Sequence, residues 1–209
     1  ALGQSIHFFA SGDASLKPEV LRNIERALPF AQDDPFALSV FSVALARFGR
    51  AREALRQTQR AVQLNPNLGV AYVAMGFAQV MLGLNDESIA SLDRNRRLAP
   101  GDFGSAPAAI YRATAHLQAG RMDEAFEAIE QGFAINQAFV GVLLMRTGIA
   151  SLAGRAEDAR DSMRRLRQGM PGATVETCLL QLAARMDPAS PAVPAFEAAF
   201  RKVWDETPN

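Results

Sequence analysis

The chain contains a long apolar segment at residues 68–84, LGVAYVAMGFAQVMLGL, in which Gln79 is the only strongly polar side chain. Such a pattern fits either a membrane-spanning helix or a helix that a larger structure buries on nearly every side. The segment is slightly short for a bilayer, which needs ~20 apolar residues. Polar residues flank it closely, at 65–67 and 85–87, and no basic or aromatic anchor stands at either end. The pattern of the remaining chain decides between the two.

Glycines divide the chain at regular intervals, because Gly49, Gly83, Gly120 and Gly154 are spaced 34, 37 and 34 residues apart. The segments around them are alike and read ARFGRAREAL, VMLGLNDESI, LQAGRMDEAF and SLAGRAEDAR. A small residue stands five positions after each glycine, and a proline stands seventeen positions after three of them: Ala54, Ser88, Ala125 and Ala159, and Pro66, Pro100 and Pro171. Glycine suits a left-handed turn, acidic residues favour the start of the next helix, and proline ends that helix. The pattern therefore predicts pairs of amphipathic helices joined by tight turns.

A 34-residue unit with Gly-x4-Ala and a late proline resembles the tetratricopeptide repeat (TPR). The resemblance covers nearly the whole chain and implies an all-α fold, a single right-handed superhelical solenoid of about twelve helices. Four units are expected at 35–68, 69–102, 106–139 and 140–173. Residues 1–34 are expected to form a degenerate unit that ends in the helix PEVLRNIERALPFA, and 174–209 a degenerate unit with the capping helix AFEAAFRKVWDE. The apolar segment 68–84 then becomes the first helix of the second complete unit, so we expect no membrane span.

Charge and cysteine content narrow the partners and the compartment. Lysine plus arginine balance aspartate plus glutamate at 22 each, so no overall charge recruits nucleic acid or an acidic membrane. The single cysteine, Cys178, excludes an internal disulfide framework. The start, ALGQSIHFFASGD, lacks the basic region and apolar core of a secretory signal. We therefore expect a cytoplasmic location, and because the chain begins at Ala1 we expect it to be a piece of a longer protein.

Residue types that carry chemistry are few. Neither His7 nor His116 has a carboxylate or cysteine at a ligand spacing, so both are expected to have packing roles. Cys178 lies in the apolar stretch CLLQLAA without a basic neighbour, as a structural thiol does. Phosphate-binding, zinc-protease and serine-hydrolase motifs are absent, and the Asp-Phe-Gly in PGDFGSAP lacks the other kinase segments. We expect a protein that is not an enzyme and needs no cofactor or metal.

Arginines gather at 93–97 and 160–167, both on expected second helices. Acidic residues are interleaved with them, which favours a solvated face with i,i+4 ion pairs over a nucleic-acid contact. Arg112 and Arg146 stand at one repeat position, where the family has a large apolar residue. Either their stems lie along the core and the guanidinium groups reach water or a carboxylate, or the two groups stack to form an anion site.

The TPR resemblance implies that the first helix of each unit lines a concave groove. The family's contact positions fall on Phe36, Ser39, Val43 and Arg47; on Val70, Val73, Phe77 and Met81; on Ile110, Tyr111, Thr114 and Gln118; and on Leu144, Gly148 and Leu152. These positions lack the lysines and asparagines that clamp a C-terminal carboxylate in some members. An apolar groove suits a hydrophobic helix or extended segment, from a partner or from the chain's own flanking region. The alternative is that these residues are core between the repeats.

Two functions follow from the resemblance. The first is a protein–protein interaction module, a TPR scaffold that binds a peptide or helix in its groove or mediates self-association as a homo-oligomer. The second rests on the loop APGDFGSAP, the unit AGRMDEAFEAIEQGFAIN and the ending LAARMDPASPAVPAFEAAFRKVWDE. These segments loosely resemble the C-terminal TPR region of bacterial class III adenylate cyclases and related winged-helix regulators. That resemblance implies a regulatory fragment of a larger signalling protein whose effector domain is absent here.

Overall fold

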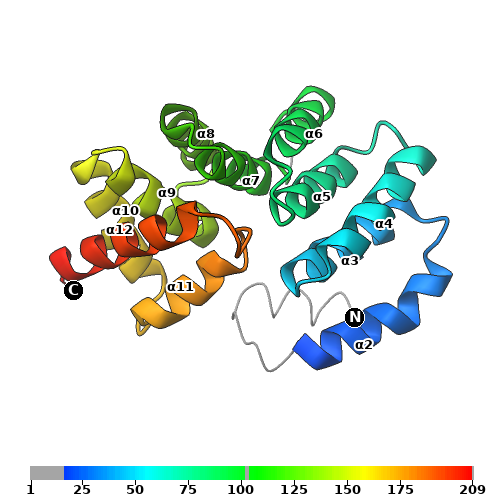
Figure 1. The fold of residues 1–209 in the computed structure, drawn as a ribbon, viewed down its shortest axis with the longest axis horizontal. Helices are drawn as coiled ribbons and strands as arrows, with labels where there is room; N and C mark the ends of the chain where they lie inside the picture. Colours follow the sequence, from blue (N-terminus) through cyan, green and yellow to red (C-terminus); the bar gives the residue numbers. More distant parts are fainter. Residues whose placement is uncertain (1–16, 102–103, 209) are drawn as a thin grey trace.

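The computed structural model describes residues 17–101 and 104–208, which form eleven α-helices, one short 3-10 helix and no strand (Figure 1). The helices are α2 (Lys17–Ala27), the 3-10 helix η2 (Leu28–Phe30), α3 (Pro35–Arg47), α4 (Ala51–Leu64), α5 (Gly69–Val80), α6 (Asn85–Leu98), α7 (Ser105–Gln118), α8 (Met122–Ile135), α9 (Val140–Leu152), α10 (Ala156–Gly169), α11 (Val175–Ala183) and α12 (Ala192–Glu206). The predicted all-helical solenoid of about twelve helices is confirmed. The first helix expected within the unit 1–34 lies outside the described residues.

The turns between paired helices depend on glycine. Gly49, Gly83, Gly120 and Gly154 have φ angles of +86°, +71°, +74° and +72°. In each turn the residue after glycine donates its N–H to a carbonyl five residues earlier, as Arg50 N does to Leu45 O at 2.8 Å. This is the Schellman arrangement, which satisfies a carbonyl at the helix end. Because side chains other than glycine tolerate this conformation poorly, the glycine spacing sets the spacing of the turns.

The small residues of the repeat lie where paired helices approach most closely. Ala54, Ser88, Ala125 and Ala159 are all fully buried. The Ser88 hydroxyl donates to the Gly76 carbonyl at 2.9 Å, which joins α6 to α5. A Cβ on Gly76 would lie only 2.7 Å from Cγ of Leu92, so the helices could not be this close with a larger residue there. Small side chains therefore fix the geometry of the pair.

The four helix pairs stack into an arc. Helices α3, α5, α7 and α9 pack against one another in succession, and each also packs against the second helix of the preceding pair. In Figure 1 the helices α4, α6 and α8 lie along the outer side of this arc. The apolar segment at 68–84 is α5, surrounded by α3, α4, α6 and α7. Within the described residues, no helix combines the length and apolar character that crossing a membrane requires.

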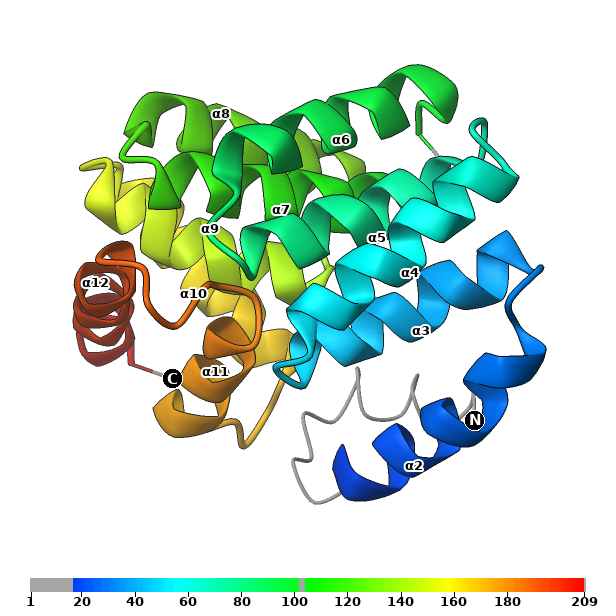
Figure 2. The same cartoon turned by 45° about the vertical axis from the view of Figure 1, so that its right-hand side comes forward.

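The C-terminal end departs from the repeat. Helix α12 packs mainly against α9 and more lightly against α10, α11 and α7 (Figure 2). Phe196, Phe200 and Val203 form its buried side, while Arg201 and Lys202 are exposed. Arg167 of α10 holds the last turn, because its Nη2 donates to the Trp204 carbonyl at 2.9 Å and its guanidinium carbon lies 4.0 Å from the Trp204 ring centroid. The last helix is therefore amphipathic, with its apolar stripe on the array.

Candidate peptide-binding groove

The expected groove residues lie on the inner helices α3, α5, α7 and α9 or directly after them, and most of them are buried. Fully or nearly fully buried are Ser39, Val73, Phe77, Ile110, Tyr111, Thr114, Leu144 and Gly148; partly exposed are Val43, Arg47, Val70, Met81, Gln118 and Leu152; Phe36 is 53% exposed. The Ser39 hydroxyl donates to the Pro35 carbonyl at 2.6 Å, and Thr114 donates to Ile110 at 2.9 Å. These two polar side chains are thus satisfied within their own helices.

The chain's own C-terminal segment occupies part of the inner face. The Phe196 ring of α12 lies against Gly148 of α9, so closely that a Cβ there would come within 2.5 Å of Cε2 of the ring. Gln118 makes a second attachment, because its Oε1 accepts from the Asp187 N–H at 2.7 Å. The Gln118 amide nitrogen also donates to Val80 O at 3.2 Å and to Asn85 Oδ1 at 2.9 Å. Groove positions of the third and fourth units are therefore in contact with residues 187–196.

An aromatic pair forms the middle of the inner face. The rings of Phe77 and Tyr111 stack with centroids 4.3 Å apart and an interplanar angle of 18°. The guanidinium carbon of Arg47 lies 5.7 Å from the Phe77 centroid. Cation–π attraction and stacking thus join α3, α5 and α7 through three residues that the TPR resemblance places in the groove.

Arg185 lies beside this pair and was not predicted from the sequence. It is 7% exposed, on the connection between α11 and α12, and its Nη1 donates to the Gln181 carbonyl. A Cβ on Gly141, in the first turn of α9, would lie 3.5 Å from Arg185 Nη2. Burial and the nearby charge of Arg47 lower the pKa of Arg185, which the neighbouring Tyr111 partly opposes. Among the described residues no carboxylate forms an ion pair with it, so its charge is buried without compensation.

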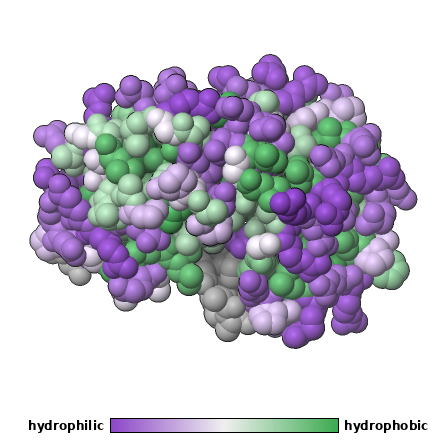
Figure 3. All heavy atoms as spheres, viewed as in Figure 1, coloured by the Kyte–Doolittle hydropathy of each residue, from purple (hydrophilic) through white to green (hydrophobic). Residues whose placement is uncertain are grey.

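Between the described residues of the inner face lies a cleft of about 620 Å³ that we call the turn cleft. Its walls are the α3–α4 turn with the first part of α4, the residues after α5, and the connection after α11. Arg47 and Met81, both expected groove residues, line it, together with Ala183 and Asp187. On the face shown in Figure 3, hydrophobic residues gather in two areas, over the N-terminal and the C-terminal half, with hydrophilic residues around them. Two of the predicted groove residues, Arg47 and Met81, are therefore reachable from the turn cleft.

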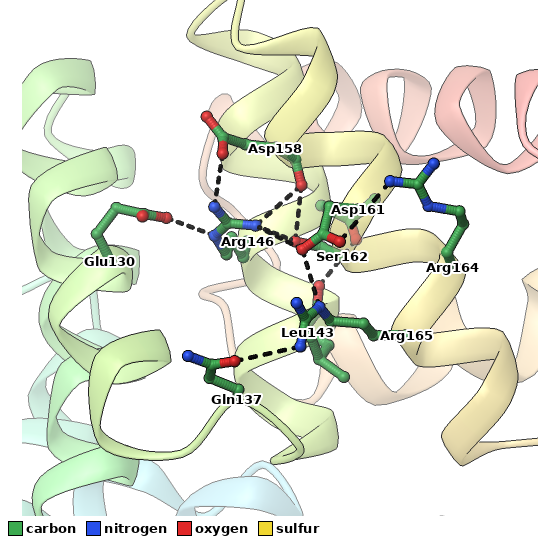
Figure 4. A network of polar contacts seen from close by, with 10 residues as sticks. Glu130, Gln137, Leu143, Arg146, Asp158, Asp161, Ser162, Arg164 and Arg165 are labelled. Carbon is green, nitrogen blue, oxygen red and sulfur yellow. Dashed lines mark hydrogen bonds and ion pairs between the residues drawn. The ribbon is translucent and has the colours of Figure 1, made fainter.

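Arg146 occupies an internal network (Figure 4). Its side chain is 4% exposed and donates from Nε to Glu130, from Nη2 to Asp158 Oδ1 at 2.8 Å and from Nη1 to Ser162 Oγ at 2.7 Å. The guanidinium carbon also lies 4.2 Å from the Phe133 ring centroid. This one side chain therefore connects α8, α9 and α10.

Arg112, the other half of the expected anion pair, is engaged separately. It forms an ion pair with Asp93 at 3.4 Å and donates from Nη2 to Gln131. Both arginines are therefore surrounded by acceptors on neighbouring helices, and an added anion would be repelled by the carboxylates already there. On the outer face, Arg164 and Arg165 likewise pair with Asp161, at 3.7 Å and 2.9 Å.

The groups expected to be inert lie in apolar or shielded surroundings. Burial raises the pKa of the Cys178 thiol to about 11, so the thiol is protonated at neutral pH and is a poor nucleophile. Burial, followed by the charge of Arg121, lowers the pKa of His116. Within residues 17–101 and 104–208 no three histidine, cysteine or acidic side chains are grouped as metal ligands. His7 lies outside the described residues.

The fold is a TPR-type solenoid. Glycine turns close its helix pairs, small residues lie where the paired helices approach closely, and the first helices form its inner face. Solved structures share this fold. A thermophilic TPR protein from Thermus thermophilus, TTC0263, is 19% identical with a TM-score of 0.70 over 86% of this chain and 94% of its own. PilW, a type IV pilus biogenesis factor, is 16% identical with a TM-score of 0.64, over 97% and 88%. YrrB, described as a TPR protein with an unusual peptide-binding site, is 12% identical with a TM-score of 0.53, over 90% and 93%. The sequence matches no protein-family model and no curated protein.

Proposed function

We propose that the protein is a non-catalytic interaction module that binds a partner peptide segment in the turn cleft. The observation that carries the proposal is that the described residues fill part of the inner face and leave this cleft between them, with Arg47 and Met81 on its wall. Solenoids of this type present their inner face as a binding surface. The similarity to YrrB, a TPR protein with an unusual peptide-binding site, supports a peptide as the kind of ligand.

The cleft has the size and lining that such a ligand requires. Its volume of about 620 Å³ lies within the range of ~300–1,000 Å³ typical of ligand sites. Met81, Leu82 and Pro188 supply apolar surface, and Arg47 and Asp187 supply charge. An extended segment can place alternate side chains on these two kinds of surface.

A peptide-display selection on the full chain tests the proposal. Ala183 is exposed and lines the cleft, so Ala183→Trp should fill part of it without disturbing the core. Ala90→Trp is the matched control, because Ala90 is an exposed helical alanine of α6 outside the cleft. We expect peptides enriched on the parent and on Ala90→Trp to be lost on Ala183→Trp.

Two results would overturn this proposal. One is a selection that enriches no peptide above background, or enriches the same peptides on Ala183→Trp. The other is a concentration-dependent increase in mass, measured by sedimentation velocity, that Ala183→Trp abolishes. That second result would assign the cleft to a second copy of this chain instead of a peptide partner.

A further inference from the structure

The turn cleft concentrates positive charge in a chain that is neutral overall. The whole sequence has 22 basic and 22 acidic residues. Among the described residues, the cleft is lined by five basic side chains (Lys17, Arg47, Arg50, Arg52 and Arg56) and two acidic ones (Glu53 and Asp187), a formal excess of three positive charges. A concave surface of one sign focuses its field and attracts ligands of the opposite sign.

Most of this excess is not neutralised by the protein itself. Arg50 forms ion pairs with Glu25 at 2.5 Å and with Glu53 at 2.7 Å, so its charge is compensated. Arg52 and Arg56, which line the cleft from α4, are exposed and form no ion pair with any described residue. They stand one helical turn apart, where two like charges repel each other and weaken the helix. A ligand with negative charge would relieve this repulsion.

A third cation, Arg185, is buried near Arg47 of the cleft. Arg185 is flanked in sequence by Ala184 and followed by Asp187, both of which line the cleft, and Arg47 supplies a further nearby charge. Its side chain is more than nine-tenths buried and lacks a carboxylate partner among the described residues. A buried guanidinium group without a counter-charge is costly, and it favours any anion that reaches it.

We propose, on the basis of the function above, that the partner segment is acidic and alternates carboxylate with apolar side chains. The carboxylates pair with Arg52, Arg56 and the Arg47–Arg185 pair, and the apolar side chains contact Met81 and Leu82. Asp187 and Glu53, which also line the cleft, disfavour a continuous phosphate backbone. Among the described residues, the one aromatic ring that lines the cleft is that of Phe48, which is 8% exposed, so these walls offer no exposed ring on which bases could stack.

Fluorescence anisotropy with labelled, amidated eight-residue peptides tests the partner's chemistry. The probes are (Glu-Leu)4, its neutral counterpart (Gln-Leu)4, and a twelve-nucleotide oligothymidylate as the nucleic-acid arm. The variant is Arg52→Glu with Arg56→Glu. Its matched control is Arg22→Glu with Arg26→Glu, which changes the same charge at the same spacing on α2, where both arginines are exposed and lie outside the cleft.

We expect (Glu-Leu)4 to bind the full chain at least tenfold more tightly than (Gln-Leu)4. The α4 double variant should weaken binding at least tenfold, the α2 control by less than twofold, and both should keep the parent's circular-dichroism spectrum. Equal binding of the acidic and neutral peptides, equal loss in the two variants, or tighter binding of the oligonucleotide overturns the acidic-segment proposal. If display selection enriches only peptides without acidic residues, this inference fails while the proposed function stands; if it enriches none, both fail.

Discussion

The ring of Phe196 occupies the space that a side chain on Gly148 would need. A Cβ at that position would lie 2.5 Å from Cε2 and 2.9 Å from Cε1 of the ring. Alanine normally stabilises a helix by ~1 kcal/mol relative to glycine, but overpacking a core costs ~1–3 kcal/mol. We therefore expect Gly148→Ala to lower the free energy of unfolding by up to ~2 kcal/mol, the difference of these terms. Gly169→Ala, where no atom lies within 4 Å of the added Cβ, should be neutral or stabilising in the same urea titration. Equal stability of the two variants would contradict the α9–α12 contact.

Phe77 is buried in the core, although the TPR resemblance places it in the groove. Its ring is fully buried and stacked on Tyr111. Phe77→Glu should therefore destabilise the protein by ~4 kcal/mol or more, because it removes the ring and buries a carboxylate. The matched variant Phe36→Glu changes an exposed groove position and should cost less than ~1 kcal/mol. Thermal melts of both variants check this, and a Phe77→Glu protein that melts like the parent would place the ring at a solvent-facing surface.

Arg185 should lower the stability of the folded protein and, at the same time, contribute to binding of an acidic peptide. Replacing it with methionine removes a buried charge that has no described carboxylate partner and keeps a long side chain. Such replacements are neutral or stabilising, by ~1 kcal/mol or more. We expect Arg185→Met to melt at or above the temperature of the parent and to bind (Glu-Leu)4 at least fivefold more weakly. A loss of several degrees in melting temperature would show instead that Arg185 is a structural residue.

Arg146 should behave in the opposite way, because its donors are taken by acceptors on two neighbouring helices. Arg146→Met leaves Glu130 and Asp158 without their partner and should cost ~2–4 kcal/mol in urea denaturation. Arg165→Met removes a more exposed ion pair with Asp161 and should cost less than ~1 kcal/mol. The comparison fails if both variants lose the same stability.

The Cys178 thiol should make stability fall at alkaline pH. Its pKa is about 11 in the folded chain, against ~8.5 for a free cysteine. Between these values the unfolded chain releases a proton that the folded chain keeps, so the folded state loses up to ~1.4 kcal/mol per pH unit. Below pH ~8 the thiol is protonated in both states and contributes no slope. Urea titrations at pH 8 and pH 10 should show a larger loss in the parent than in Cys178→Ala, and parallel losses would contradict the raised pKa.

The repeated part of the fold could be predicted because its signals are local and recur. The turns at Gly49, Gly83, Gly120 and Gly154 each need a positive φ, which glycine adopts readily. The spacing of these glycines alone therefore locates the helix pairs. The carboxylate partners of Arg146 lie on other helices, and its position in the repeat could only suggest that its charge needed an acceptor.

The covering of the inner face could not be predicted in the same way. Phe196 meets Gly148 across a long stretch of sequence, and nothing near either residue indicates the other. Helix α11 ends at Ala183, and the chain that follows places Arg185 against Gly141 of the inner helix α9. The TPR resemblance assigns the groove positions to the first helices, but it does not indicate which of these positions the chain's own C-terminal segment covers.

The bond between Gln118 and Asp187 has a mechanical consequence. A solenoid whose units contact only their neighbours can bend and extend, because its curvature is set separately at each interface between units. Here two residues 69 positions apart are joined by a hydrogen bond of 2.7 Å, and the same glutamine also holds the end of α5 and the start of α6. The inner curve can widen only if these bonds and the Phe196 contact break together. The array is thus a stiff arc and resists extension for as long as the contacts of Gln118 and Phe196 hold.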